Sequence, residues 1–315
     1  MDPAQFFAAS RLVIVAGKGG VGKTTVTAAL ARAAARTGLT SLIVEVEGKS
    51  GLADLFGREP LTYDEVDLAD GVRGRTLTPD DALLEYLRDH GMSRISRRLV
   101  SSGALDVVAT AAPGIKDILI LGKVKQLERA KTADLLVLDA PAAGHAITFL
   151  LAARALLDAV RVGPINTQAR EVLEMLTDHA RCQVMLVTLP EETPVNELVD
   201  TAYHLEDRVG VSLGPVVVNG VYPEIAGIDA DPDDAAAAAS TTLRDGEAQS
   251  LRDAAAFRRH RTELQREQID RLAAQLPLPQ LKLPYLFNAD LGPRELEALA
   301  GSLLDGIGEL QETRS

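Results

Sequence analysis

The chain has 315 residues, with 33 lysines and arginines against 45 aspartates and glutamates, and a formal net charge of −12. This acidic balance disfavours general nucleic-acid binding, which needs a basic surface. The length is sufficient for one large α/β domain with a full hydrophobic core. The single cysteine, Cys182, excludes an internal disulfide framework and fits a reducing compartment.

Short apolar runs alternate with helical patterns along the chain, which is typical of a parallel sheet with crossover helices. The runs are continuous rather than alternating, which predicts strands buried on both faces. The long segment between the second and third runs is expected to be mostly helical. Residues 224–234 are expected to form an acidic loop, and a charged helix is expected from 254 to 276. The predicted strands are 12–16, 41–46, 135–138, 183–189, 215–219 and 281–287.

A glycine-rich loop separates the first strand from an Ala-rich helical segment. Its spacing, G-x-x-x-x-G-K-[ST] in a strand–loop–helix context, predicts a site for a nucleoside triphosphate. The glycines let backbone N–H groups surround a phosphate, and the start of the helix adds positive potential. We expect Lys23 to contact the β- and γ-phosphates and the Thr24 hydroxyl to bind Mg²⁺. The predicted contacts of this loop are Gly17, Gly19, Gly20, Val21, Gly22, Lys23, Thr24 and Thr25.

A second lysine, Lys18, follows the first glycine of this loop. GKGGVGKTT resembles the deviant P-loop class, which includes arsenite-pump ATPases, tail-anchored-protein targeting ATPases, Min- and Par-type positioning ATPases and nitrogenase iron protein. In that class this lysine crosses a dimer interface to the partner's nucleotide. The resemblance therefore implies a face-to-face dimer in which Lys18 is catalytic. A solvated loop lysine is the structural alternative.

The third strand ends in Asp139-Ala140-Pro141-Ala142-Ala143-Gly144-His145. An aspartate after an apolar strand beside a P-loop is where Mg²⁺ is held, directly or through water. The segment is similar to switch II, D-T-A-P-x-G-H, of the arsenite-pump and targeting ATPases. We expect Asp139 to be catalytic and, with Thr24, a metal ligand; an ordinary strand end is the alternative. His145 is more simply a packing or capping residue.

The second strand leads into Glu45-Val46-Glu47-Gly48-Lys49-Ser50 and then Leu52 to Gly57, which resembles switch I of the same family. The family's catalytic aspartate falls on Glu47, and an acid common in the wider class falls on Glu45. A carboxylate there would position the water that attacks the γ-phosphate. Glutamate is one methylene longer, and misplacement of that order slows catalysis strongly. We expect slow hydrolysis with Glu47 as the water-positioning residue.

Asn219 ends the fifth strand and matches the asparagine by which this family recognises adenine, since its amide can donate and accept on one base edge. Residues 283–287 occupy the position of the family's loop beside the adenine. The resemblance thus implies ATP rather than GTP, with Asn219, Pro284 and Leu286 among the nucleotide contacts. From composition alone, Asn219 would be a strand-end turn residue.

The resemblance runs through nearly the whole chain, and it extends to a helix similar to the family's R-x-x-x-Q helix before the last strand. It implies an α/β P-loop NTPase with a mostly parallel sheet flanked by helices. We expect one ATPase domain over 1–315, with a helical subdomain inserted after switch I at approximately 78–131 and 154–180. The implied cofactors are ATP and Mg²⁺.

The number of cysteines distinguishes among the roles of the class members that this chain resembles. Arsenite-stimulated members use clustered thiolates, eukaryotic targeting members use paired Cys-x-x-Cys zinc sites, and the iron protein uses two cysteines per subunit. Cys182 is expected to be a small core residue instead. These three roles therefore lose support.

The favoured function is a dimeric ATP switch that binds and releases a protein client or partner. The dimer is a homodimer or a heterodimer with a paralogous ATPase, and the client can bear a transmembrane helix. Residues 104–121 are apolar enough to line a client groove, although packing on the core is the simpler interpretation. An ATPase subunit of an anion or arsenite efflux system and a Min- or Par-type positioning ATPase are the alternatives.

Hydropathy and charge along the chain predict its cell compartment and its remaining partners. No signal-peptide pattern opens the chain and no apolar run reaches the roughly 18 residues of a membrane span, so we expect a cytoplasmic protein. Membrane association is expected only through a partner. Residues 90–131 are locally basic, but a solvated helical face is the simpler interpretation, and no nucleic acid is expected.

Overall fold

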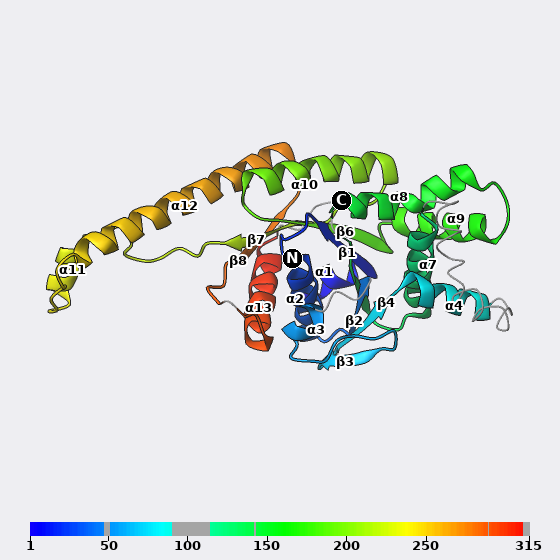
Figure 1. Ribbon diagram of the computed structural model, residues 1–315, viewed down its shortest axis with the longest axis horizontal. Coiled ribbons are helices and arrows are strands. Elements are labelled where there is room, and N and C mark those ends of the chain that lie inside the picture. The colour runs from blue at the N-terminus through cyan, green and yellow to red at the C-terminus, as the bar shows by residue number, and fades with distance from the viewer. Residues whose placement is uncertain (47–50, 90–113, 142, 289, 311–315) are drawn as a thin grey trace.

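The computed structural model describes residues 1–46, 51–89, 114–141, 143–288 and 290–310. At its centre is an eight-stranded sheet in the order β3-β4-β2-β5-β1-β6-β7-β8 (Figure 1). The pairs are parallel except β3 with β4, which is antiparallel. The predicted α/β class with a mostly parallel sheet is therefore confirmed. The strands are β1 (Leu12–Gly17), β2 (Ser41–Val46), β3 (Val66–Ala69), β4 (Val72–Leu77), β5 (Leu135–Asp139), β6 (Cys182–Thr188), β7 (Val216–Val221) and β8 (Gln280–Pro284).

Two strands, β3 and β4, lie where the sequence predicted mostly helical structure. β4 reads Val-Arg-Gly-Arg-Thr-Leu, and its arginines hide the strand from a search for apolar runs. In the structure Arg75 is nonetheless buried, with its guanidinium 4.5 Å from the centre of the Tyr63 ring. The prediction was wrong here because contacts that exist only in the folded chain bury a charged side chain that looks exposed in sequence.

Helices cover both faces of the sheet (Figure 1). One layer contains α1 (Pro3–Ala8), α2 (Lys23–Arg36), α3 (Gly51–Leu55) and α13 (Pro293–Glu309). The opposite layer contains α7 (Ile115–Ala130), α8 (Ala143–Ala159), α9 (Pro164–Thr177) and α10 (Glu192–His204), which a π-helical turn, η1 (Leu205–Val209), extends. α4 (Pro79–Asp89) packs on α7. The apolar face of α13 is buried, with Leu303 and Ile307 fully enclosed.

Two further helices, α11 (Pro232–Ala238) and α12 (Glu247–Gln275), form an arm that projects from the body (Figure 1). α12 starts earlier than the predicted residue 254. α11 begins inside the segment predicted to be a loop, because Asp231 caps it and Pro232 occupies its first turn, where proline is tolerated. In α12 the buried side chains are Gln265 and Leu272. The arm is therefore anchored at one end and largely solvated along its length.

The helical region proposed as a subdomain packs against the same core as the sheet. Ile118, Ile120 and Leu121 of α7 are buried together with residues of β1, β2 and β5. Of the candidate groove 104–121, residues 104–113 lie outside the described part of the chain. None of the described helices is both long enough and apolar enough to cross a membrane.

Candidate nucleotide site

The glycine loop lies at the carboxyl end of β1, in the interior of the sheet, and turns directly into α2. Gly20 and Gly22 have φ values of +87° and +88°, in the left-handed region that favours glycine. A Cβ on Gly22 would lie 2.3 Å from Asn219 Nδ2, and one on Gly17 would lie 2.4 Å from the Val187 carbonyl oxygen. The loop thus needs glycine both for its backbone conformation and for its close contacts.

A cavity of about 340 Å³ opens beside this loop. It brings the loop together with the ends of β2 and β5, which are distant in sequence but adjacent at the carboxyl edge of the sheet. The first turn of α2 points its backbone N–H groups toward this space, which suits an anion. The cavity is lined by Gly19, Gly20, Gly22, Lys23, Thr24, Val46, Asp139 and Ala140.

Two oxygen donors meet at one wall of the cavity. The Thr24 hydroxyl donates to Asp139 Oδ2 over 2.7 Å, and Asp139 is 6% exposed. Hydroxyl and carboxylate oxygens are the protein ligands that Mg²⁺ prefers. Their chemistry and position beside a phosphate-sized cradle fit a magnesium ion bound together with a nucleotide.

The two lysines of the loop are engaged within the chain. Lys23 Nζ donates to the Lys18 carbonyl oxygen over 2.9 Å. Lys18 Nζ lies 2.6 Å from Glu197 Oε1 of α10. Sequence reasoning missed Glu197, because no local motif marks a partner 179 residues away.

Among the switch I residues, Glu47 lies outside the described part of the chain. Glu45 is 3% exposed, and its Oε2 accepts a hydrogen bond of 2.9 Å from the Thr76 hydroxyl of β4. Its backbone position is directly opposite Asp139 in the β2–β5 register. Two buried acids therefore stand side by side at the carboxyl edge of the sheet. The description of switch II likewise excludes Ala142 and the side chain of His145.

Asn219 lies against the glycine loop. Its Nδ2 donates to the Val21 carbonyl oxygen over 2.9 Å, so the amide braces the loop from β7. Gln265 of α12 holds the backbone that follows Asn219, accepting from Tyr222 N over 2.8 Å and donating to Gly220 O over 3.0 Å. Gln265 is the glutamine of the R-x-x-x-Q pattern, whose contacts the sequence alone did not indicate.

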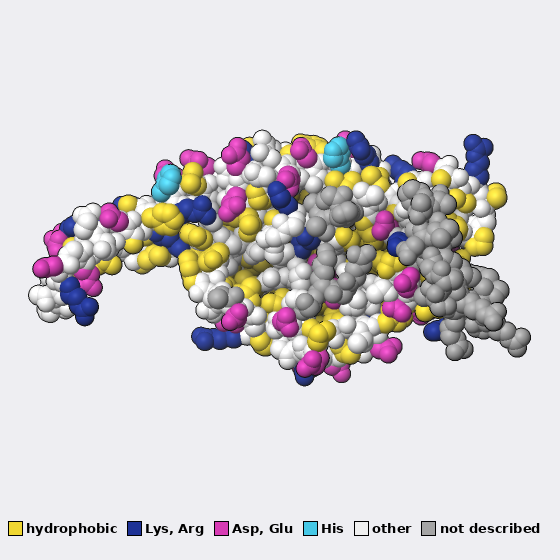
Figure 2. All heavy atoms as spheres, viewed as in Figure 1, with side chains coloured by type: hydrophobic (Ala, Val, Ile, Leu, Met, Phe, Trp, Pro, Cys, Tyr) yellow, Lys and Arg dark blue, Asp and Glu magenta, His cyan; other side chains and the backbone are white. Residues whose placement is uncertain are grey.

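Pro284 is the last residue of β8, which pairs with the strand β7 that carries Asn219. Leu286 follows Pro284 two residues later in the chain. Tyr285 and Phe287 flank Leu286 and form an aromatic cluster with Tyr222, with ring centres 4.8 to 5.6 Å apart. Tyr285 and Phe287 are 44% and 64% exposed. Hydrophobic side chains gather at this junction of arm and body in Figure 2.

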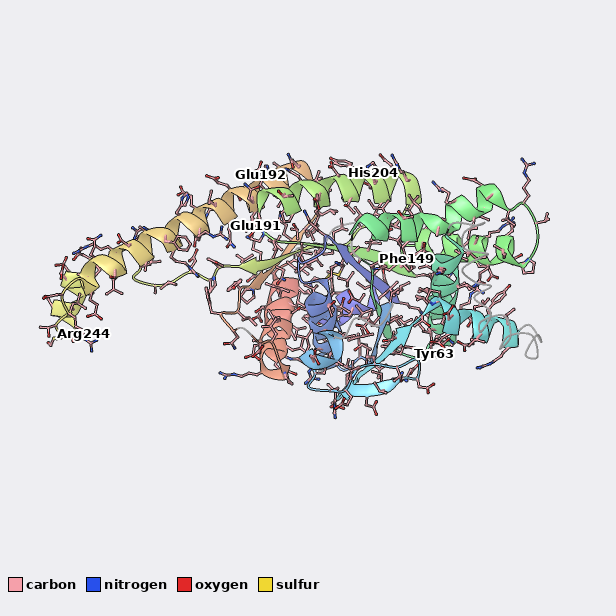
Figure 3. All side chains as sticks on the ribbon, in the orientation of Figure 1. Tyr63, Phe149, Glu191, Glu192, His204 and Arg244 are labelled. Carbon is pink, nitrogen blue, oxygen red and sulfur yellow. The ribbon has the colours of Figure 1, made fainter. Side chains whose placement is uncertain are left out.

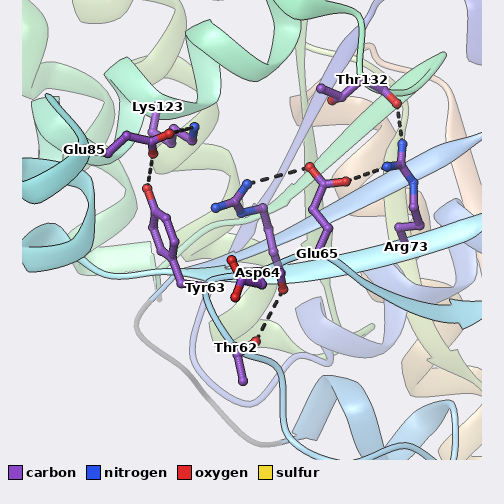
Figure 4. A network of polar contacts seen from close by, with 9 residues as sticks. Thr62, Tyr63, Asp64, Glu65, Arg73, Glu85, Lys123 and Thr132 are labelled. Carbon is purple, nitrogen blue, oxygen red and sulfur yellow. Dashed lines mark hydrogen bonds and ion pairs between the residues drawn. The ribbon is translucent and has the colours of Figure 1, made fainter. Parts of the chain in front are cut away.

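A separate polar network lies at the opposite end of the molecule from the arm, around Tyr63 (Figures 3 and 4). The Tyr63 hydroxyl donates to Glu85 of α4, and Lys123 of α7 lies 2.7 Å from the same carboxylate. Burial and the neighbouring carboxylate raise the pKa of Tyr63. Burial opposes ionisation of Glu85, but the hydrogen bonds from Lys123 and Tyr63 outweigh it and lower the pKa of this carboxyl.

Three described basic residues of the stretch 90–131, Lys123, Lys125 and Arg129, form ion pairs with acids. Besides Lys123, Lys125 pairs with Glu171 at 2.5 Å and Arg129 approaches the same carboxylate at 3.4 Å. Cys182 is fully buried, and burial raises the pKa of its thiol. The expected core position of Cys182 is therefore observed.

The parallel sheet with a glycine loop between β1 and α2 defines a P-loop NTPase fold. The family model of anion-transporting ATPases matches residues 10–162, which contain the glycine loop and Asp139. ATPase BagA of Mycobacterium tuberculosis is 36% identical over 225 residues, covering 68% of this chain and 66% of that protein. The chain belongs to the anion-transporting ATPase family, as its motifs predicted.

More distant relatives extend the similarity. A Halobacterium salinarum protein with a provisional assignment as an arsenical pump-driving ATPase is 25% identical over 325 residues, which is 95% of this chain and 46% of that protein. ATPase ASNA1 homolog 2 of Paramecium tetraurelia is 26% identical over 143 residues, covering 44% of this chain and 42% of that protein. In all three cases the match spans less than two thirds of the relative's length.

Proposed function

We propose that the chain is a Mg·ATP-dependent switch ATPase that works as a dimer. The observation that carries this proposal is the 2.7 Å contact between Thr24 and Asp139 beside the glycine cradle. It joins a P-loop hydroxyl to a carboxylate from the neighbouring strand, as a magnesium site for a bound triphosphate requires. Membership of the anion-transporting ATPase family supports the same activity.

Each site residue has a distinct task in this proposal. The loop residues 17–25 surround the phosphates with backbone N–H groups, and Lys23 exchanges the Lys18 carbonyl oxygen for phosphate oxygens. Thr24 and Asp139 would hold the metal, which when bound neutralises charge on the phosphates. Asn219, Pro284 and Leu286 are proposed to flank the adenine, with Asn219 also bracing the loop through Val21.

Hydrolysis is proposed to be slow, with Glu47 positioning the attacking water. The support is the order of the switch I segment, since Glu47 follows β2 and β2 ends at the cavity beside Val46. Glutamate in place of aspartate moves the carboxylate by one methylene, and such shifts cost rate strongly. The buried Glu45, two residues earlier in the chain, accepts a hydrogen bond from Thr76.

Phosphate release in the presence of Mg·ATP tests this assignment. We expect slow turnover by the native chain, none by Lys23→Ala, and at least about a tenfold loss in Glu47→Gln. ATP binding should persist in Glu47→Gln and fail in Lys23→Ala. Turnover by Glu47→Gln at the native rate would refute the role of Glu47 and leave the binding site untouched.

The dimer is proposed to bind and release a protein client or partner. Cys182, the sole cysteine of the sequence, is enclosed by the core, so it is a poor candidate for an arsenite ligand. A Glu47→Gln trap with Mg·ATP, compared with Lys23→Ala, should capture the partner from cytosol and membranes. Single-span membrane proteins would support targeting, and a paralogous ATPase would support a heterodimer. Recovery of an anion channel subunit would favour the efflux alternative instead.

A further inference from the structure

Lys18 forms an ion pair inside its own chain. Its Nζ lies 2.6 Å from Glu197 Oε1, and the two side chains are 38% and 44% exposed. The backbone carbonyl of Lys18 is engaged as well, because it accepts the hydrogen bond from Lys23. Both the side chain and the backbone of this residue are therefore held by groups of the same chain.

We infer that Glu197 is a positioning residue that retains Lys18 within its own chain and competes with the partner's nucleotide for the Lys18 ammonium. This inference rests on the proposed dimeric function. An ammonium that lies 2.6 Å from Glu197 on its own α10 cannot also reach a nucleotide across an interface. Each Lys18 must leave Glu197 before the dimer is complete.

The charges favour movement of the Lys18 ammonium from Glu197 to the partner's nucleotide. A triphosphate carries several negative charges, whereas Glu197 carries one, so phosphate is the stronger acceptor once the partner's site is loaded. The Lys18–Glu197 pair is partly solvated, and ion pairs of that kind contribute little stability. The pair can therefore hold the lysine in the free chain and release it when a nucleotide-loaded partner arrives.

The position of Glu197 connects the loop to the arm. Glu197 lies on α10, and α10 is attached to α12 by hydrogen bonds at both ends: Arg271 donates to the Glu192 carbonyl over 3.1 Å, and the Tyr203 hydroxyl donates to the Gln275 carbonyl over 3.1 Å. Figure 1 shows the C-terminal part of α12 beside α10. Release of Lys18 therefore removes a direct link between the phosphate loop and the α10–α12 pair.

The test compares Glu197→Gln with Asp200→Asn, a matched loss of one charge from an exposed residue on the same helix. Sedimentation velocity with Mg·AMP-PNP measures the monomer–dimer dissociation constant. We expect Glu197→Gln to lower this constant about two- to thirtyfold, since a symmetric dimer releases two weak ion pairs, and Asp200→Asn to leave it unchanged. In a Lys18→Ala background, Glu197→Gln should have no further effect.

Acylation of lysines, read by mass spectrometry on the nucleotide-free chain, gives an independent result. Lys18 should react faster in Glu197→Gln than in the native chain or in Asp200→Asn. Equal dimerisation of all three proteins, or equal Lys18 reactivity, would overturn the inference and leave the dimer intact. If the native chain binds AMP-PNP but no protein dimerises, the dimeric switch itself fails and this inference fails with it.

Discussion

Thr24 and Asp139 are separated by 115 positions in the sequence, yet their side-chain oxygens lie 2.7 Å apart. Their residue types and flanking patterns were enough to predict both as metal ligands, because Thr24 completes the glycine-loop pattern and Asp139 ends an apolar strand. Contacts that depend on packing were not predictable in the same way. Asn219 was matched to adenine recognition, and its bond to the Val21 carbonyl emerges only when β7 is placed beside the loop.

Gly22 gives a direct prediction at the residue scale. An alanine at Gly20 or Gly22 must adopt a left-handed conformation, which costs about 1–2 kcal/mol. At Gly22 the new Cβ would also displace the Asn219 amide and its hydrogen bond to Val21, whereas at Gly20 it would meet no atom within 4 Å. We therefore expect Gly22→Ala to be the more destabilising substitution by about 1 kcal/mol in nucleotide-free protein.

Urea unfolding of Gly22→Ala, Gly20→Ala and Asn219→Ala measures these differences. Adding Asn219→Ala to Gly22→Ala should cost little further stability, because the hydrogen bond is already lost. Full additivity of the two substitutions would show that Gly22 and Asn219 are not coupled through the loop.

At the scale of elements, the continuous apolar strands and their crossover helices were predictable from the sequence. The polar strands β3 and β4 at one edge of the sheet were not. β4 carries Arg73 and Arg75, which both form ion pairs with Glu65 of the preceding segment. That pairing requires the β3–β4 hairpin to exist already, so a search for hydrophobic runs cannot find it. β8 also ends at Pro284 rather than at 287, since proline cannot donate to a neighbouring strand.

The Tyr63–Glu85–Lys123 network predicts that the stability of the folded chain depends on pH. The pKa of Glu85 is lower in the folded chain than its ordinary value of 4.5. The carboxylate therefore contributes stability that is complete above about pH 4.5 and is lost as the pH falls through the lower folded value. We expect Glu85→Gln to cost about 1–3 kcal/mol at neutral pH, and this cost to shrink in acid.

Urea unfolding of the native chain and of Glu85→Gln between pH 7 and pH 3.5 measures the loss of unfolding free energy directly. Glu174→Gln, which alters an exposed acid on the neighbouring α9, provides the control and should show a small cost at every pH. A cost for Glu85→Gln that stays constant or grows as the pH falls would contradict the assigned network.

For the whole molecule, the family and the sheet class followed from the order of the motifs along the chain. The projecting arm did not, because α12 is charged around its circumference and its length says nothing of where it points. The arm, α10 and the glycine loop form one connected path through Gln265, Glu192 and Glu197. Conformational changes that start at the nucleotide therefore have a physical route to the most exposed part of the molecule.

The central claim is that the glycine loop, Thr24 and Asp139 form one site for Mg·ATP. Calorimetric titration of ATP, with Mg²⁺ and with chelator, into the native chain and Asp139→Asn tests it most directly. Asp134→Asn is the control, since Asp134 precedes the opposite end of β5 and binds Thr40. We predict that Mg²⁺ tightens ATP binding at least about tenfold, or 1.4 kcal/mol, in the native chain and Asp134→Asn, and that Asp139→Asn loses most of this gain. A native chain that binds no ATP, or an Asp139→Asn variant that keeps the full magnesium effect, would contradict the account.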